Sequence, residues 1–184
     1  MGLLARWLTN TTSLALPLGF AFAAMQVPAL THDYTAALLQ VAEDVRRDID
    51  QRETSAKHFY QLAGGSDEEV IAALKPFEPS NAETLKGSLD RARSLRAAYE
   101  RVSAATPLLQ PVVAVADMME DLKGYKTTVL GTVFRVYEPQ LVVNSGSAIY
   151  GLIGLAMGSF LAQLILSGIA RLRRSAAPAR RPAS

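Results

Sequence analysis

Cysteine is absent from this sequence and histidine occurs only twice, which removes several kinds of chemistry at the outset. Without cysteine the chain forms no disulfide, carries no thiolate nucleophile and offers a metal no sulfur ligand. His32 and His58 fall far apart on one predicted helix, and neither belongs to an HExxH motif. A metal site is therefore not expected, and no cofactor is predicted.

Catalytic motifs are also missing. The sequence contains no glycine-rich phosphate loop, no GxSxG nucleophile elbow and no dinucleotide fingerprint. Asp117, Glu120 and Asp121 lie close together, but a solvated helix face is the simpler explanation for three acidic residues on one helix. The residues therefore predict a protein that is not an enzyme.

Two long stretches lack every charged residue. No Lys, Arg, Asp or Glu occurs between Trp7 and Thr31 or between Gln140 and Ala170. A charge at the centre of a membrane helix costs roughly 2.5 to 3.5 kcal/mol, so charge-free segments of this length predict membrane spans. The expected domain organisation is an N-terminal transmembrane anchor over 1–30, an extracytoplasmic helical domain over 31–140, a transmembrane helix over 141–171 and a disordered basic cytoplasmic tail over 172–184.

The second span carries a row of small residues. Ala148 to Ile169 would measure about 33 Å as a helix, enough to cross the hydrocarbon core of a bilayer. Small residues three or four positions apart let two membrane helices approach closely. The spacing predicts a helix-packing face, whose partner could be the first span, a second copy of the chain or another protein. The face consists of Gly151, Gly154, Gly158 and Ala162.

The first span is less regular, and two interpretations of it stay open. Pro17 interrupts the apolar segment, and Ala21-Phe22-Ala23 has the A-x-A pattern of a signal-peptide cleavage site. Proline is tolerated in a membrane helix where neighbouring helices satisfy the freed carbonyl group. We favour an uncleaved anchor, with a cleaved signal segment as the alternative.

Basic residues flank both spans on one side. Lys and Arg close to the ends of a span favour the cytoplasm, which predicts both termini inside and the middle segment in the periplasm. The pI near 9.0 has the same origin, because residues 31–140 hold all 17 acidic residues but only 13 of the 19 basic ones. The tail has no aromatic residue, so nucleic-acid binding is not expected. The topology-setting residues are Arg6, Arg171, Arg173 and Arg174.

Helical signals dominate the middle segment. Thr31 can cap a helix of about thirty residues, with apolar residues every three or four positions, that ends at Gly64-Gly65. Ser66 to Glu69 has the capping-box pattern and opens a short helix that ends before Pro76. Ser80 to Glu83 is predicted to be a second capping box, at the start of the next helix.

Two further helices complete the expected fold. A helix from Pro107 to Gly124 has apolar positions at Leu109, Val112, Val113, Ala116, Met119 and Leu122. Tyr125 to Tyr137 has the composition of a strand, but its four-residue spacing of large residues and the lack of a partner strand favour a helix. The expected fold class is all-α, with two transmembrane helices flanking an antiparallel helical bundle or a long helical hairpin.

Four local motifs resemble those of one protein family. They are Gln26-Val27-Pro28, Tyr34, Val136-Tyr137-Glu138-Pro139 and the glycines from Gly151 to Gly158. With them the chain resembles a bacterial domain-of-unknown-function family of two-span inner-membrane proteins with a helical extracytoplasmic middle segment. The resemblance implies a bacterial inner-membrane location and no particular activity.

The expected function is that of a non-catalytic accessory or scaffold subunit of a larger membrane complex. Its expected partners are the lipid bilayer and either other membrane subunits or further copies of the chain. The alternative is a ligand-sensing transmembrane protein, which would signal through a partner because only a short tail follows the second span. A transporter or small enzyme is disfavoured, since ion paths through membranes use polar or ionisable groups and neither span contains a charge.

Overall fold

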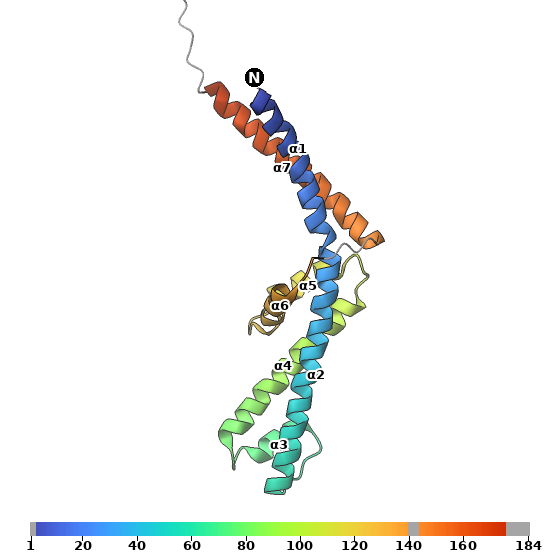
Figure 1. Ribbon diagram of the computed structural model, residues 1–184. Helices are drawn as coiled ribbons and strands as arrows, with labels where there is room; N and C mark the ends of the chain where they lie inside the picture. The colour runs from blue at the N-terminus through green and yellow to red at the C-terminus, as the bar shows by residue number, and fades with distance from the viewer. Residues whose placement is uncertain (1–2, 140–143, 176–184) are drawn as a thin grey trace, which may run out of the picture. The chain divides into compact units, whose positions relative to one another are not determined.

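The computed structural model describes residues 3–139 and 144–175, and every regular element within them is an α-helix (Figure 1). Side chains at 3–6, 8–9 and 170–175 lie outside this description. The all-α fold class is therefore confirmed. The helices are α1 (Leu3–Met25), α2 (Val27–Tyr60), α3 (Asp67–Leu74), α4 (Pro79–Ala104), α5 (Gln110–Met119), α6 (Tyr125–Val136) and α7 (Ser145–Ser175).

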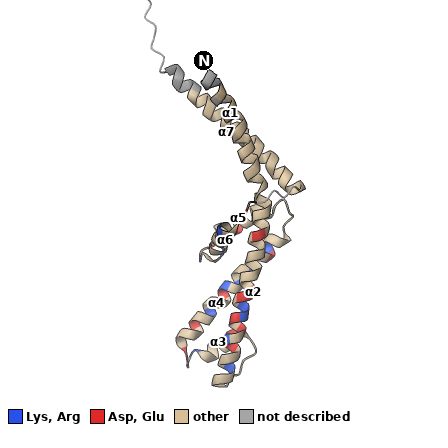
Figure 2. Cartoon of the chain, viewed as in Figure 1, with Lys and Arg blue, Asp and Glu red and all other residues tan. Residues whose placement is uncertain are grey.

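The chain divides into two compact units. Unit 1 comprises Met1–Ala29 and Pro139–Ser184, and unit 2 comprises Leu30–Glu138. Figure 2 shows Lys, Arg, Asp and Glu along the helices of unit 2, whereas the described side chains of α1 and α7 include none of them. The long charge-free helices of unit 1 therefore favour an apolar environment, whereas the charged helices of unit 2 favour water.

Unit 1 consists of α1 and α7, which pack against each other. Two helical stretches are long and apolar enough to cross a membrane, one beginning at Asn10 within α1 and the other being Ser145–Ile169 of α7. Pro17 lies inside α1 without ending it, at the cost of one backbone hydrogen bond.

The core of unit 2 follows one face of α2 and the facing side of α4. Its largest cluster joins the first turns of α2 to α4, α5 and α6, and a second cluster joins Ile49 to the first half of α4. Many of the buried positions are alanine, so the helices pack closely around a thin core. The largest cluster consists of Tyr34, Leu38, Ala42, Leu95, Ala98, Val102, Ala114 and Val129.

The predicted start and the predicted end of the long helix α2 were both wrong. α2 begins at Val27 rather than at Thr31, because Pro28 falls in the first turn, where its missing N–H is not needed. Thr31 lies inside the helix, and its carbonyl oxygen accepts a hydrogen bond from the Thr35 hydroxyl at 2.7 Å. The helix ends at Tyr60, four residues before Gly64, because Gln61 adopts a left-handed conformation with φ of 53°.

One of the two predicted capping boxes is present. The Ser66 hydroxyl accepts from the Glu69 N–H, and the Glu69 carboxylate accepts from the Ser66 N–H, as a capping box requires. The second box was wrong, because α4 begins at Pro79 and Ser80 already lies within the helix. Proline suits the first helical position, since its fixed φ is helical and its missing N–H would be unpaired there.

Replacing Ser66 by alanine should therefore lower the free energy of unfolding by about 1 kcal/mol, the usual cost of losing an N-cap hydroxyl. Ser80→Ala is the matched control and should have no comparable effect, because Ser80 lies within α4, whose N-cap residue is Glu78. Chemical denaturation of the full chain in detergent, followed by circular dichroism, measures both. Equal losses in the two variants would contradict this assignment of the caps.

Of the last two helices of unit 2, α5 differs from the prediction and α6 agrees with it. α5 is shorter than predicted, from Gln110 to Met119, and Pro111 occupies its first turn. Its buried face is Pro111, Ala114 and Asp117, so the predicted apolar residues lie mostly outside the core. Gly124, in a left-handed conformation with φ of 71°, precedes α6, and the predicted helix from Tyr125 is confirmed.

Candidate functional sites

The small residues of α7 lie where α1 approaches most closely. A Cβ atom added to Gly158 would lie 2.7 Å from the Pro17 Cα atom, and one added to Gly154 would overlap the Phe20 carbonyl oxygen. A Cβ atom on Gly151 would lie 2.8 Å from Met25 Cγ. The structure thus places α1 of the same chain against this face, an assignment that the spacing alone left open.

The remaining members of the predicted sites are only partly described. Ala162 is buried on α7. The side chains predicted to set the orientation in the membrane, Arg6, Arg171, Arg173 and Arg174, lie outside the described residues. Most of the predicted basic tail, 176–184, lies outside them as well.

A buried ion cluster joins α4, α5 and α6. Asp117 was predicted to lie on a solvated face, and this was wrong, because only 5% of its surface is exposed. Lys126, also 5% exposed, places its Nζ atom 2.9 Å from Asp117 Oδ2 and donates to the Asp117 carbonyl oxygen at 3.0 Å. Arg101 Nε donates to Asp117 Oδ1 at 2.7 Å. Two cations from neighbouring helices therefore compensate the buried carboxylate.

Two more polar groups belong to the surroundings of this cluster. The Tyr34 hydroxyl is fully buried and has no hydrogen-bond partner among the described residues. Burial, followed by the charges of Asp117 and Asp121, raises the pKa of Tyr34, so the phenol stays protonated. Asp121 accepts from the N–H groups of Tyr125 and Thr127, at 3.1 and 2.9 Å, and so caps α6. Asp117, Lys126 and the Tyr34 hydroxyl are buried, whereas the Arg101 side chain is half exposed, and together these groups hold α4, α5 and α6 in place.

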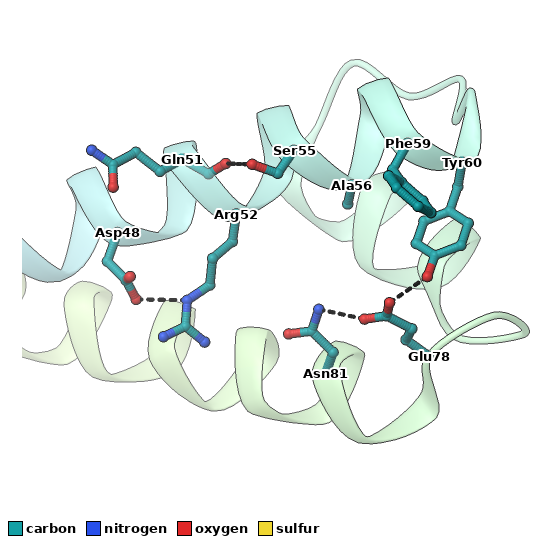
Figure 3. A pocket seen from close by; sticks show the side chains of 9 residues that line it. All are labelled: Asp48, Gln51, Arg52, Ser55, Ala56, Phe59, Tyr60, Glu78 and Asn81. Carbon is teal, nitrogen blue, oxygen red and sulfur yellow. Dashed lines mark hydrogen bonds and ion pairs between the residues drawn. The ribbon is translucent and has the colours of Figure 1, made fainter.

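A cleft of about 380 Å³ opens between α2 and α4, at the end of unit 2 where α2 turns into α3 (Figure 3). Arg52 Nε lies 2.9 Å from Asp48 Oδ2 on one side of it. On the other side the Glu78 carboxylate accepts from the Tyr60 hydroxyl and, at 2.7 Å, from Asn81 Nδ2. These hydrogen bonds lower the pKa of Glu78, and the bond from Tyr60 has the largest effect. The cleft is lined by Asp48, Gln51, Arg52, Ser55, Ala56, Phe59, Tyr60, Glu78 and Asn81.

Three aromatic rings meet beside this cleft. The Tyr60 and Phe77 rings stack with centroids 5.0 Å apart, and Phe59 meets Tyr60 edge-on at 5.3 Å. Phe59 is 80% exposed and Phe77 57% exposed, which is unusual for phenylalanine. Exposed aromatic residues next to arginine are typical of protein-binding surfaces. We call Phe59, Tyr60 and Phe77 the aromatic cluster.

The sequence interpretation missed the aromatic cluster. Phe77 falls in the turn between Pro76 and Pro79, where no helical periodicity applies. Phe59 lies one residue before Tyr60, which follows Ala56 at the four-residue spacing of the apolar face of α2, so the Phe59 ring points elsewhere on the helix. The position of Phe59 outside the apolar face was the one signal in the sequence that could have indicated the aromatic cluster.

A second buried carboxylate lies beside the α2–α3 junction. Glu53 is buried, and one of its oxygens has no hydrogen-bond partner among the described residues. Burial, reinforced by the charge of Asp67, raises the pKa of Glu53. Asp67 itself is bound by Arg46 through two hydrogen bonds, which lower the pKa of Asp67.

Over the described part of the chain, no three His, Cys, Asp or Glu side chains gather as metal ligands would.

Comparison with known proteins identifies a family but no characterised relative. No curated protein and no solved structure matches the chain. The sequence profile of one family, "Protein of unknown function (DUF2937)", matches residues 8–175. This range contains all four motifs on which the resemblance rests, from Gln26 to Gly158. The chain, with two helices able to span a membrane and a helical segment between them, belongs to the DUF2937 family of proteins of unknown function.

Proposed function

We propose that this protein is an integral membrane protein that acts as a non-catalytic accessory or scaffold subunit of a larger membrane complex. The aromatic cluster is the observation that carries the proposal. Phe59 and Phe77 expose their rings to solvent, and a partner protein that covered them would bury this apolar surface and so stabilise the complex. Arg52 and Asn81 in the adjoining cleft supply polar groups for the rim of such an interface.

Membrane insertion through α1 and α7 is the second part of the proposal. Their length and apolar composition support it, as does the close packing of glycines against α1. The flanking arginines favour both termini on the cytoplasmic side, with unit 2 in the periplasm of a bacterial inner membrane. A periplasm-only reporter fused after Arg174 would be inactive in this topology.

The ion cluster around Asp117 supports a scaffold more than an enzyme. Asp117 is buried and is paired with Lys126 and with the half-exposed Arg101. Charged groups held in such pairs position helices, whereas a catalytic acid or base has to reach its substrate.

Ligand sensing is the alternative function, and the α2–α4 cleft favours it. At about 380 Å³ the cleft falls within the range of small-molecule sites. A ligand seated between α2 and α4 would shift one helix against the other, and signalling would then pass to a partner membrane protein.

Loss of the aromatic cluster should release the partner subunit. The full chain, tagged and purified from native membranes in nanodiscs, should bring down a stoichiometric second protein. In the Phe59→Ser, Phe77→Ser variant its recovery should fall about 30-fold, the effect of losing a hot spot worth roughly 2 kcal/mol.

Phe134→Ser is the matched control, because Phe134 on α6 is as exposed as Phe77, at 57%, but lies outside the cluster. Its partner recovery should equal that of the unmodified protein. Recovery of the unmodified protein alone would contradict the accessory role and favour sensing. Equal recovery in all three proteins would exclude the aromatic cluster as the contact.

A further inference from the structure

One face of α5 and its flanking turns carries large exposed apolar side chains, with the exposed charged residues Glu120 and Lys123 beside its C-terminal end. Its large side chains have exposed fractions between 42% and 99%, and no charged residue occurs from Val102 to Ala116. The three- and four-residue spacing of Val112, Val115 and Met119 places them on one side of α5, and Leu108 and Leu122 lie in the turns before and after it. We call this face the α5 stripe, and it consists of Leu108, Val112, Val115, Met119 and Leu122.

The α5 stripe cannot turn inward, because the opposite side of the helix is held in place. Ala114 packs in the core, and Asp117 is paired with Lys126 and Arg101. A rotation that buried Val112 or Val115 would pull the Asp117 carboxylate away from both cations. Breaking a buried ion pair costs more than burying two valines would gain. The exposed stripe is therefore a stable feature of unit 2.

The α5 stripe lies at the end of unit 2 where the chain enters and leaves it. Ala114 shares a core cluster with Tyr34 and Leu38, which belong to the first turns of α2. The other chain end follows α6, whose Val129 belongs to the same core cluster. In the sequence, α1 precedes the first of these ends and α7 follows the second, and both helices are able to cross a membrane.

We infer that the α5 stripe rests on the lipid surface of the bilayer, with its side chains at the boundary between headgroups and acyl chains. The inference rests on the proposed insertion of α1 and α7, which brings this end of unit 2 to the membrane. An amphipathic helix with one apolar face binds in this way through the area that it buries. Because the stripe carries no Lys or Arg, zwitterionic lipid is sufficient and anionic lipid adds no attraction.

The absence of cysteine makes the test direct, since any introduced cysteine takes a nitroxide label uniquely. The full chain is reconstituted in phosphatidylcholine nanodiscs with a label at Val112→Cys, Val115→Cys or Leu122→Cys. Oxygen partitions into lipid and a nickel chelate stays in water. We expect the stripe labels to be relaxed by oxygen and to lose nickel accessibility relative to Ser103→Cys, an exposed position on α4. Added phosphatidylglycerol should leave this result unchanged.

Each other outcome has a definite meaning. Stripe labels relaxed mainly by the nickel chelate would overturn the inference. Labels protected from both reagents would also overturn it, because a second copy or another protein would then cover the stripe. Leu152→Cys, on the outer face of α7, reports insertion separately: if it too were nickel-accessible, the proposed membrane insertion itself would fail. Leu122 lies outside α5, so its label gives the same readout without altering the helix.

Discussion

Lys126→Met should destabilise unit 2 by roughly 3 to 5 kcal/mol, the cost of leaving a buried carboxylate without its buried cation. Lys126 and Asp117 are both almost fully buried, so water cannot replace the lost charge. Arg101 remains in contact with Asp117 but is half exposed, which favours the lower end of the range. Urea unfolding of the full chain in detergent, followed by circular dichroism, measures the loss.

Two further variants separate the ion pair from general effects of substitution. Lys123→Met is the control, since its pair with Asp90 lies on the surface and such pairs contribute little. Combining Asp117→Asn with Lys126→Met removes both charges and should recover much of the stability lost by Lys126→Met alone. Additive losses in the double variant would show that the two side chains do not depend on each other.

Gly154→Leu should separate α1 from α7. Even the first atom of the new side chain would overlap the Phe20 carbonyl oxygen and lie 2.7 Å from Ala24 Cβ. Overpacking usually costs about 1 to 3 kcal/mol, and we expect the upper end because the obstacle is backbone rather than a flexible side chain. Nitroxide labels at Thr11→Cys and Gln163→Cys, read by pulsed electron resonance, should show a longer and broader distance distribution than in the unmodified chain.

Gly168→Leu is the matched control for helix propensity. Nothing lies within 4 Å of a Cβ atom added there, so the same chemical change on the same helix should leave the distance distribution unaltered. An unchanged distribution in Gly154→Leu would contradict the packing of α7 on α1. A change in oligomeric state with unchanged distances would instead assign the glycine face to a second copy.

Features that depend on neighbouring residues were predictable from the sequence. The Ser66 capping box needs only residues within one helical turn, and the spacing from Tyr125 to Tyr137 was enough to favour α6. Ser80 failed as a cap for an equally local reason, because Pro79 is better suited to begin the helix. The preference for proline at that position was the stronger signal.

The composition and periodicity of the chain were sufficient to predict helices, charge-free spans and family membership, because each of these is recorded in a short stretch of sequence. Three-dimensional packing was needed to show which face of α5 is buried, since Arg101, Asp117 and Lys126 come from three helices and meet only in the fold. The same holds for the aromatic cluster, where a turn brings Phe77 onto Tyr60. Burying a charge depends on partners far along the chain, and no local pattern contains them.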